Sequence, residues 1–247
     1  MRNVSPARAL LRRSQLLLQL AFVFITGGIF LGVVGLALYA IPVTGAGQEI
    51  NPIVNLGRLL ILLGGGVLFL IGAGMVIRAV TWKTDNDLAM MTAKVLIDHI
   101  DDRYTLIRNI NGRPVGYVDA LLIGPGGVLV FRTTDMVGKF LNERSKWLRR
   151  TNNQWKISLS NPTQDALDDL KSVRDHLVHH KLEDMPVYGI VILTQPEDKI
   201  QVLLKDSVLP IVYLEDLVPR LYEGFLAKER VTNPKSIESA IKLFYKT

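Results

Sequence analysis

Residues 117–138 read YVDALLIGPGGVLVFRTTDMVG, and this stretch decides the fold. Two runs rich in Val, Leu, Ile, Phe and Thr, at 116–123 and 128–133, have the composition of β-strands. Gly124-Pro125-Gly126-Gly127 between them is a turn signal, because glycine tolerates positive φ and proline presets its own φ. A phosphate-binding glycine loop is the alternative, but no helix start follows the glycines. The stretch therefore predicts a β-hairpin.

The residues around the hairpin extend the prediction to an α/β sandwich. Asn161 is suited to cap a helix, Pro162 suits the first helical turn, and Gln164 sits where a capping-box side chain reaches back. Elsewhere, helical spacing of apolar residues alternates with short apolar runs. The predicted order is helix, three strands, helix, two strands and two helices, at residues 87–99, 104–110, 116–123, 128–133, 161–180, 187–193, 209–213, 214–226 and 234–245. Mixed order of this kind indicates one α/β domain.

The first third of the chain is apolar enough to lie in a membrane. Residues 16–41 contain no charged side chain, and the stretch 59–79 contains only Arg78. About 20 apolar residues cross a bilayer as a helix, so two transmembrane helices are predicted at about 16–41 and 59–79. A cleaved signal peptide is the alternative for the first, but its apolar run is too long. The predicted domains are a membrane anchor at 1–82 and a cytoplasmic domain at 83–247.

The charge distribution gives the membrane topology. The chain has 29 Lys and Arg, 23 Asp and Glu, a net charge of +6 and no cysteine, which excludes disulfides and thiolate chemistry. Residues 1–82 contain six arginines and one acid, so this segment accounts for +5 of the net charge of +6. The excess positive charge therefore lies around the predicted spans and does not indicate a nucleic-acid site. The positive-inside rule predicts a multi-pass protein of the cell membrane with both termini cytoplasmic and residues 42–55 outside. Arg58 lies at the outer end of the second span, against this rule, and can snorkel to the membrane interface.

Glycines in the predicted spans suggest close helix packing. Gly28 and Gly32 have the small-xxx-small spacing, which indicates packing of the two helices against each other or formation of a homo-oligomer. Neither span contains Asp, Glu, Lys or His. Ion or proton transport through ionisable intramembrane residues is therefore excluded as a function.

The hairpin and the segments after it resemble the nuclease-related domain (NERD) family over about residues 86–195. That resemblance implies the restriction-endonuclease-like fold of the PD-(D/E)xK superfamily, in which two carboxylates hold Mg²⁺ and a lysine helps to activate water. The features that carry it are the strand with Asp119, the GPGG turn, the second apolar strand, Gly138, Trp147, Trp155, the Asn161-Pro162 helix start and the strand 187–193.

Carried over position by position, the resemblance implies a degenerate catalytic site. Asp119 stands at the first acid, whereas Arg132 and Thr134 stand where the second acid and the lysine belong. Residues 89–91 contain no acid for the family's first helix, and Asp165 stands at the helix-start glutamine. We expect Asp119 to be a remnant, with no bound metal. Mg²⁺ is expected only if nuclease activity survives.

Hairpin geometry predicts what replaces the metal. A hairpin closed symmetrically on Pro125-Gly126 sets Asp119 opposite Arg132, with β-carbons roughly 5 Å apart. We expect these two side chains to form a fixed ion pair in place of a metal site. The alternative is that Arg132 points to solvent and Asp119 is an ordinary strand-end residue.

Two other clusters are candidates for binding. A basic cluster interleaved with tryptophan could contact nucleic-acid phosphates or anionic lipid headgroups, or could be a solvated hairpin. Histidines at helical spacing could bind a metal, but at a helix C-terminus they also complement the dipole. Aspartates at the start of the same helix suit its N-terminus and need no catalytic role. The basic cluster is Lys139, Arg144, Lys146, Arg149, Arg150 and Lys156, the histidines are His176, His179 and His180, and the aspartates are Asp165, Asp168 and Asp169.

These observations predict a membrane-anchored NERD-like domain that serves as a non-catalytic binding or scaffold module on the cytoplasmic face. Its expected partners are the lipid bilayer and either a cytoplasmic protein or nucleic acid. The competing hypotheses are a diverged metal-dependent nuclease, with Lys139 as a substitute base, and a tethered nucleic-acid-binding protein.

Overall fold

The computed structural model describes residues 1–4, 8–40, 52–112 and 114–246, and the chain divides into two compact units. One unit is Ala9–Thr84; the other combines Met1–Arg8 with Asp85–Thr247. The first is helical and the second contains sheets and helices. The predicted fold class, an α/β domain after two long apolar helices, is confirmed.

The helical unit consists of α1 (Arg8–Ala40) and the greater part of α2 (Pro52–Ile97). Within them, Ser14–Ala40 and Pro52–Thr81 have mean hydropathies of 2.4 and 2.5 and are long enough to cross a membrane. The helix predicted at 87–99 is the last part of α2. Residues 42–51 of the predicted outer turn lie outside the described residues.

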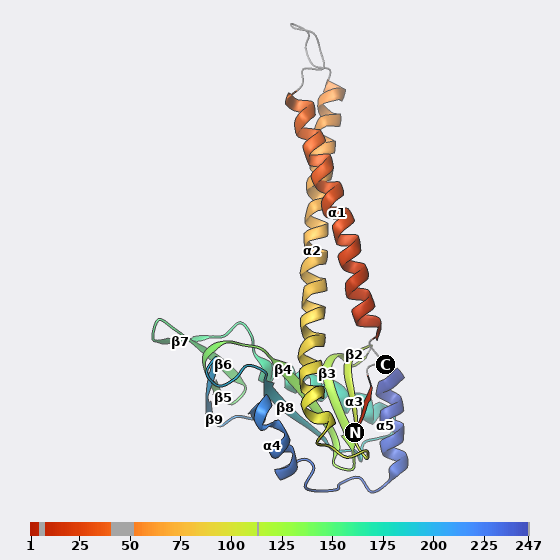
Figure 1. Cartoon of the computed structure of the whole chain (residues 1–247), viewed down its shortest axis with the longest axis vertical. Helices are drawn as coiled ribbons and strands as arrows, with labels where there is room; N and C mark the ends of the chain where they lie inside the picture. The colour runs from red at the N-terminus through yellow and green to blue at the C-terminus, as the bar shows by residue number, and fades with distance from the viewer. Residues whose placement is uncertain (5–7, 41–51, 113, 247) are drawn as a thin grey trace. The chain divides into compact units, whose positions relative to one another are not determined.

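Glycines bring α1 and α2 together in antiparallel orientation (Figure 1). A β-carbon at Gly28 would lie 2.6 Å from the backbone nitrogen of Phe69, and one at Gly65 would lie 2.6 Å from that of Gly32. The predicted packing between the two helices therefore uses Gly28, whereas a β-carbon at Gly32 would meet no atom within 4 Å and Gly32 contributes only its backbone to the contact with Gly65. The homo-oligomer remains a prediction. Arg58 lies with its guanidinium carbon 5.8 Å from the centre of the Tyr39 ring.

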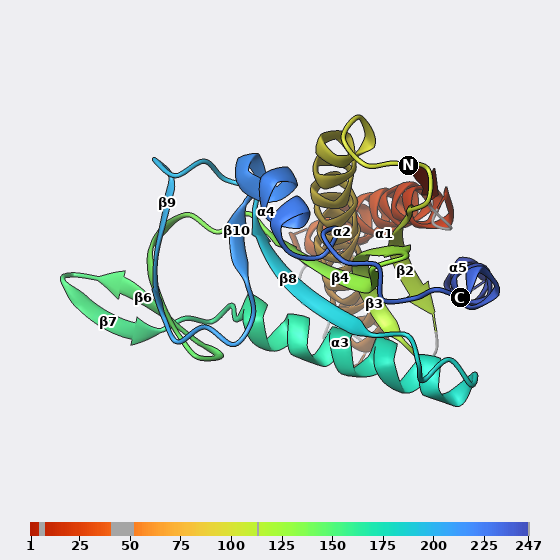
Figure 2. The same ribbon diagram turned by 90° about the horizontal axis from the view of Figure 1, so that it is seen from below.

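Six of the described strands form one sheet in the order β1-β2-β3-β4-β8-β10 (Figure 2). The predicted hairpin is confirmed, because Gly124 pairs with Gly127 and Ala120 pairs with Phe131 in an antiparallel register. Parallel neighbours extend the sheet on both sides of the antiparallel strands. The strands are β1 (Arg2–Val4), β2 (Thr105–Gly112), β3 (Gly116–Gly124), β4 (Gly127–Thr134), β8 (Val187–Leu193) and β10 (Ile211–Tyr213).

Helices cover both faces of this sheet and bury its apolar residues. On one face, α3 (Pro162–His179) and α5 (Pro234–Lys246) pack against a core that contains Val128 and Val130. On the other, α4 (Leu217–Glu223) and the end of α2 pack against a core that contains Phe131. The helix predicted at 214–226 is shorter than expected: its first turn, Leu214–Asp216, is a 3₁₀ helix.

The sequence did not predict a second sheet, which has the order β7-β6-β5-β9. Its hairpin β6–β7 lies away from the six-stranded sheet in both views (Figures 1 and 2). Phe140, Trp147 and Ile200 form its buried core together with Leu193 of β8. The strands are β5 (Gly138–Glu143), β6 (Lys146–Thr151), β7 (Gln154–Ile157) and β9 (Ile200–Lys205).

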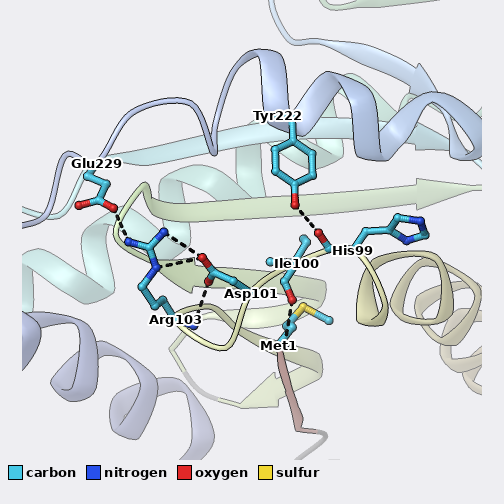
Figure 3. A network of polar contacts seen from close by, with 7 residues as sticks. All are labelled: Met1, His99, Ile100, Asp101, Arg103, Tyr222 and Glu229. Carbon is cyan, nitrogen blue, oxygen red and sulfur yellow. Dashed lines mark hydrogen bonds and ion pairs between the residues drawn. The ribbon is translucent and has the colours of Figure 1, made fainter.

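The first residues of the chain belong to the sheet-containing unit, although the predicted anchor began at residue 1. Strand β1 pairs in parallel with β2, and the amino group of Met1 donates to the carbonyl of Ile100 at 2.9 Å and to Asp102 Oδ1 at 2.7 Å. Figure 3 shows Met1 beside Ile100, with Asp101 bound to Arg103 nearby. Three residues are too few to give a periodic signal, so the sequence showed no strand here.

Candidate functional site

Asp119 lies on β3 and is 3% exposed. Its Oδ2 atom accepts two hydrogen bonds from Thr133 of β4, one from the backbone amide at 2.7 Å and one from the hydroxyl at 2.9 Å. Because both donors are neutral, they stabilise the carboxylate without neutralising its charge. Asp119 is thus a structured, buried acid and not an ordinary strand-end residue.

Arg132, also on β4, reaches two aspartates of α3. Its Nη2 atom donates to Asp165 Oδ2 at 3.0 Å, and its Nη1 atom donates to Asp169 Oδ2 at 3.5 Å. The predicted direct ion pair with Asp119 was wrong, since the ion pairs that Arg132 makes among the described residues are with Asp165 and Asp169. The hairpin register was right, but α3 offers two carboxylates to the guanidinium while Thr133 binds Asp119.

The position of these aspartates on α3 explains the arrangement. Asp165, Asp169, Val173 and Leu177 recur every four residues and therefore share one helix face. Val173 and Leu177 are buried against the sheet. The helix face that carries them therefore also points Asp165 and Asp169 toward the sheet. The sequence prediction treated the aspartates only as N-terminal helix residues. Counting back from Val173 by four would have placed both on the buried face.

Contacts at the first turn of α3 fix where the acids lie. Asn161 Oδ1 accepts from the backbone amide of Gln164 at 3.1 Å, so the predicted cap is confirmed. The Gln164 side chain does not reach back as a capping box; it donates to Asp168 at 3.1 Å. Thr163, fully buried in this turn, accepts from the Trp147 indole nitrogen at 2.7 Å. The second sheet therefore holds the start of α3 in place.

The site contains three acids, Asp119, Asp165 and Asp169, around the single guanidinium of Arg132. Burial raises the pKa of Asp119, against the opposing effects of Arg132 and Thr133. Burial likewise raises the pKa of Asp169 to about 7; Arg132 lowers it, while Asp119 and Asp165 raise it further. Asp169 is paired with Arg132 and yet has a raised pKa, because burial outweighs the attraction of the guanidinium and the neighbouring acids add to the effect of burial.

Comparison with known proteins places this geometry in a family context. Residues 86–194 match the family model described as the nuclease-related domain. This segment is a nuclease-related domain. No curated protein and no solved structure matches the chain. The matched segment contains Asp119, Arg132, Asp165 and Asp169, so the whole cluster lies inside the NERD domain, and the resemblance noted from the sequence is confirmed.

The other predicted site residues of the NERD domain lie at the end of β4 and on the second sheet. Thr134 is 8% exposed, and its carbonyl accepts from the amide of Thr194 at 2.9 Å and from its hydroxyl at 3.0 Å. Lys139, the predicted substitute base, lies on β5 and is exposed. The rest of the basic cluster lies on β6, β7 and the turn before β6, namely Lys146, Arg149, Arg150, Lys156 and Arg144.

The histidines at the end of α3 pack with one another. The rings of His176 and His180 are 4.5 Å apart, and His176 lies 5.6 Å from the Phe244 ring. Burial lowers the pKa of His176, with smaller contributions from His180 and His179. Within the part of the chain that the structure describes, no group of three His, Cys, Asp or Glu side chains is arranged to hold a metal ion.

Proposed function

We propose that this chain is a membrane-anchored NERD-domain protein whose domain binds a partner and does not cleave nucleic acid. The observation that carries the proposal is Arg132, whose guanidinium lies between Asp165 and Asp169 and acts electrostatically on Asp119. A positive charge fixed among these three acids does electrostatically what a divalent cation would do. It brings no open coordination position and no bound water with it.

The residues present do not fit the Mg²⁺ that the superfamily implies. Divalent cations of this kind need several free oxygen ligands, and here Arg132 already binds one oxygen of Asp165 and one of Asp169, while Thr133 binds one oxygen of Asp119. Thr134, at the position of the family's lysine, supplies no amine. No catalytic step through a metal is therefore derived for this chain.

Metal binding and DNA cleavage test the proposal directly. We expect the full chain in detergent micelles, given single- or double-stranded DNA and Mg²⁺ or Mn²⁺, to cleave no faster than its Asp119→Ala variant. Arg132→Glu should create a Mn²⁺ site measurable by titration calorimetry, because it replaces the fixed cation with a fourth acid. Arg174→Glu, an exposed change on α3, is the matched control and should bind none.

The opposite result has a clear form. Metal-dependent cleavage by the unchanged chain that disappears in Asp119→Ala would contradict the proposal and favour a diverged nuclease. Loss of that cleavage in Lys139→Ala as well would identify Lys139 as the substitute base.

The anchoring half of the proposal rests on Ser14–Ala40 and Pro52–Thr81, which have the length and hydropathy of spanning helices. The arginines around them favour cytoplasmic termini. Because the chain has no cysteine, single cysteines can report the topology. In sealed cells we expect a membrane-impermeant maleimide to label Gly45→Cys but not Lys171→Cys. Labelling of both, or of Lys171→Cys alone, would contradict this topology.

A further inference from the structure

The second sheet has an outer face that no described element covers. Facing pairs in β5, β6, β7 and β9 point to the same side, so the register assigns every side chain to one of two faces. Phe140, Trp147 and Ile200 share the inner face and are buried. Their neighbours in the chain must point outward, and none of those outward residues is buried.

The register sets an apolar row across the middle of this outer face. Leu148 pairs with Ile157 on one side and with Leu141 on the other, and Leu141 pairs with Leu203. Each strand of the sheet thus contributes one apolar side chain to a continuous line. Ile157 is 86% exposed and Leu203 is 61% exposed, although both are large and apolar. Such a row is unusual on a surface that meets only water.

Basic residues border the apolar row on both sides. Arg150 pairs with Trp155, which is 38% exposed, and Lys139 lies one step further along the same outer row beside Gln201. On the opposite border are Lys146 and Lys205, with Glu143 between them in an ion pair to Lys205. The face therefore presents four basic side chains, one acid, and an apolar centre flanked by a tryptophan. A polar hollow of about 700 Å³ beside it is lined by Lys139, Arg150, Asn152 and Asn153.

We propose that this outer face binds the surface of an anionic phospholipid bilayer, with the apolar row and Trp155 entering the interface and the basic residues meeting lipid phosphates. Tryptophan and aliphatic side chains ringed by Lys and Arg are the composition of interfacial membrane-binding surfaces. A second copy of the face is disfavoured by like charge. A nucleic acid would use the basic residues but leaves the aliphatic row without a partner.

This inference rests on the proposed membrane anchoring, because the spans would hold the NERD domain near a bilayer. The experiment must therefore separate the two. The full chain is incorporated into nanodiscs of phosphatidylcholine alone or of an equal mixture with phosphatidylserine. A single cysteine at Leu203→Cys carries an environment-sensitive fluorophore, and the same label at Lys171→Cys on α3 is the matched control. Co-elution of chain and disc reports the anchor, whereas the fluorophore reports the face.

We expect a blue shift and quenching by acyl-chain-linked quenchers for Leu203→Cys in the anionic discs alone, with no change at Lys171→Cys. Combined Lys139→Glu and Arg150→Glu should weaken this response by at least about tenfold, since each basic residue near an anionic surface contributes to binding. Combined Arg174→Glu and Lys235→Glu should leave it unchanged. A chain that enters the discs with a silent fluorophore overturns the inference and leaves the anchor standing.

Two further outcomes decide the remaining cases. If the chain does not co-elute with the discs, the anchor fails, and flotation with anionic vesicles then tests the face alone: a response there supports the lipid surface and its absence overturns it. If a single-stranded oligonucleotide shifts the fluorophore and lipid does not, the face is a nucleic-acid site and the inference is overturned.

Discussion

Replacing Arg132 with methionine should destabilise the NERD domain by about 2–4 kcal/mol at pH 8. The change keeps most of the side-chain volume but leaves three acids without their cation, and breaking one partner of a buried pair costs several kcal/mol. Arg132 and Asp169 have side-chain exposures of 25% and 13%, whereas Asp165 is 45% exposed and its share is screened by solvent. Pulse proteolysis of the full chain in micelles across a urea series measures the loss.

The loss of stability in Arg132→Met should be smaller at about pH 5 than at pH 8. The direction of this pH dependence follows from the raised pKa of Asp169. Its pKa is about 7 in the fold against an ordinary value of 3.8, so its stability contribution is full below 3.8 and is lost as pH rises through 7. Arg132 is the group that lowers this pKa. Removing it raises the pKa further. The variant therefore loses more at pH 8, where the folded carboxyl of the unchanged chain is ionised, than at pH 5, where the folded carboxyl is protonated with or without Arg132.

Two variants make this result interpretable. Asp169→Asn in the Arg132→Met background should recover part of the stability at pH 8, because one unpaired acid disappears, and the recovery measures their coupling. Arg174→Met removes an exposed arginine on α3 and should change stability by no more than about 0.5 kcal/mol. A loss in Arg132→Met that equals this control, or that does not vary with pH, would show that the three acids do not need the guanidinium.

Asp119 and Arg132 show which parts of the candidate site could be predicted from the sequence. Their placement across the hairpin followed from a local turn, because Gly124 and Gly127 fix the register over a few residues. The partner of Arg132 did not follow. Asp165 is 33 residues away, and its approach depends on how α3 packs on the sheet. Local geometry was predictable, whereas the choice among nearby acids was decided by tertiary packing.

The second sheet was missed for a different physical reason. Its outward positions combine leucine and isoleucine with lysine and arginine, so the strands β5 and β6 lack the alternation of apolar and polar residues that marks a half-buried strand. The segment therefore read as a basic cluster. This mixed outer face is also the surface proposed to bind a bilayer. The strands that lack the expected alternation of apolar and polar residues are therefore the ones that form the candidate interface.

Trp147→Ala should have an effect of similar size, about 3–5 kcal/mol, because it empties the core of the second sheet. Trp147 is 1% exposed and packs edge-to-face on Phe140 with ring centres 5.9 Å apart. Its indole nitrogen donates to Thr163 at 2.7 Å, so the variant also leaves a buried hydroxyl without this donor. The same urea series measures the loss, with Trp155→Ala, an exposed tryptophan on β7, as control at no more than about 1 kcal/mol.

The contact between Trp147 and Thr163 also connects the second sheet to the candidate site. Thr163 lies in the first turn of α3, two residues before Asp165, so loosening this turn should weaken the bond from Arg132 to Asp165. Trp147→Phe keeps an aromatic ring, although a smaller one, and loses the donor, and we expect an intermediate loss of about 1–2 kcal/mol. If Trp147→Ala and Arg132→Met are independent, their losses will add within about 0.5 kcal/mol. We expect the double variant to lose less than that sum, because the first change already displaces the carboxylate that the second leaves unpaired.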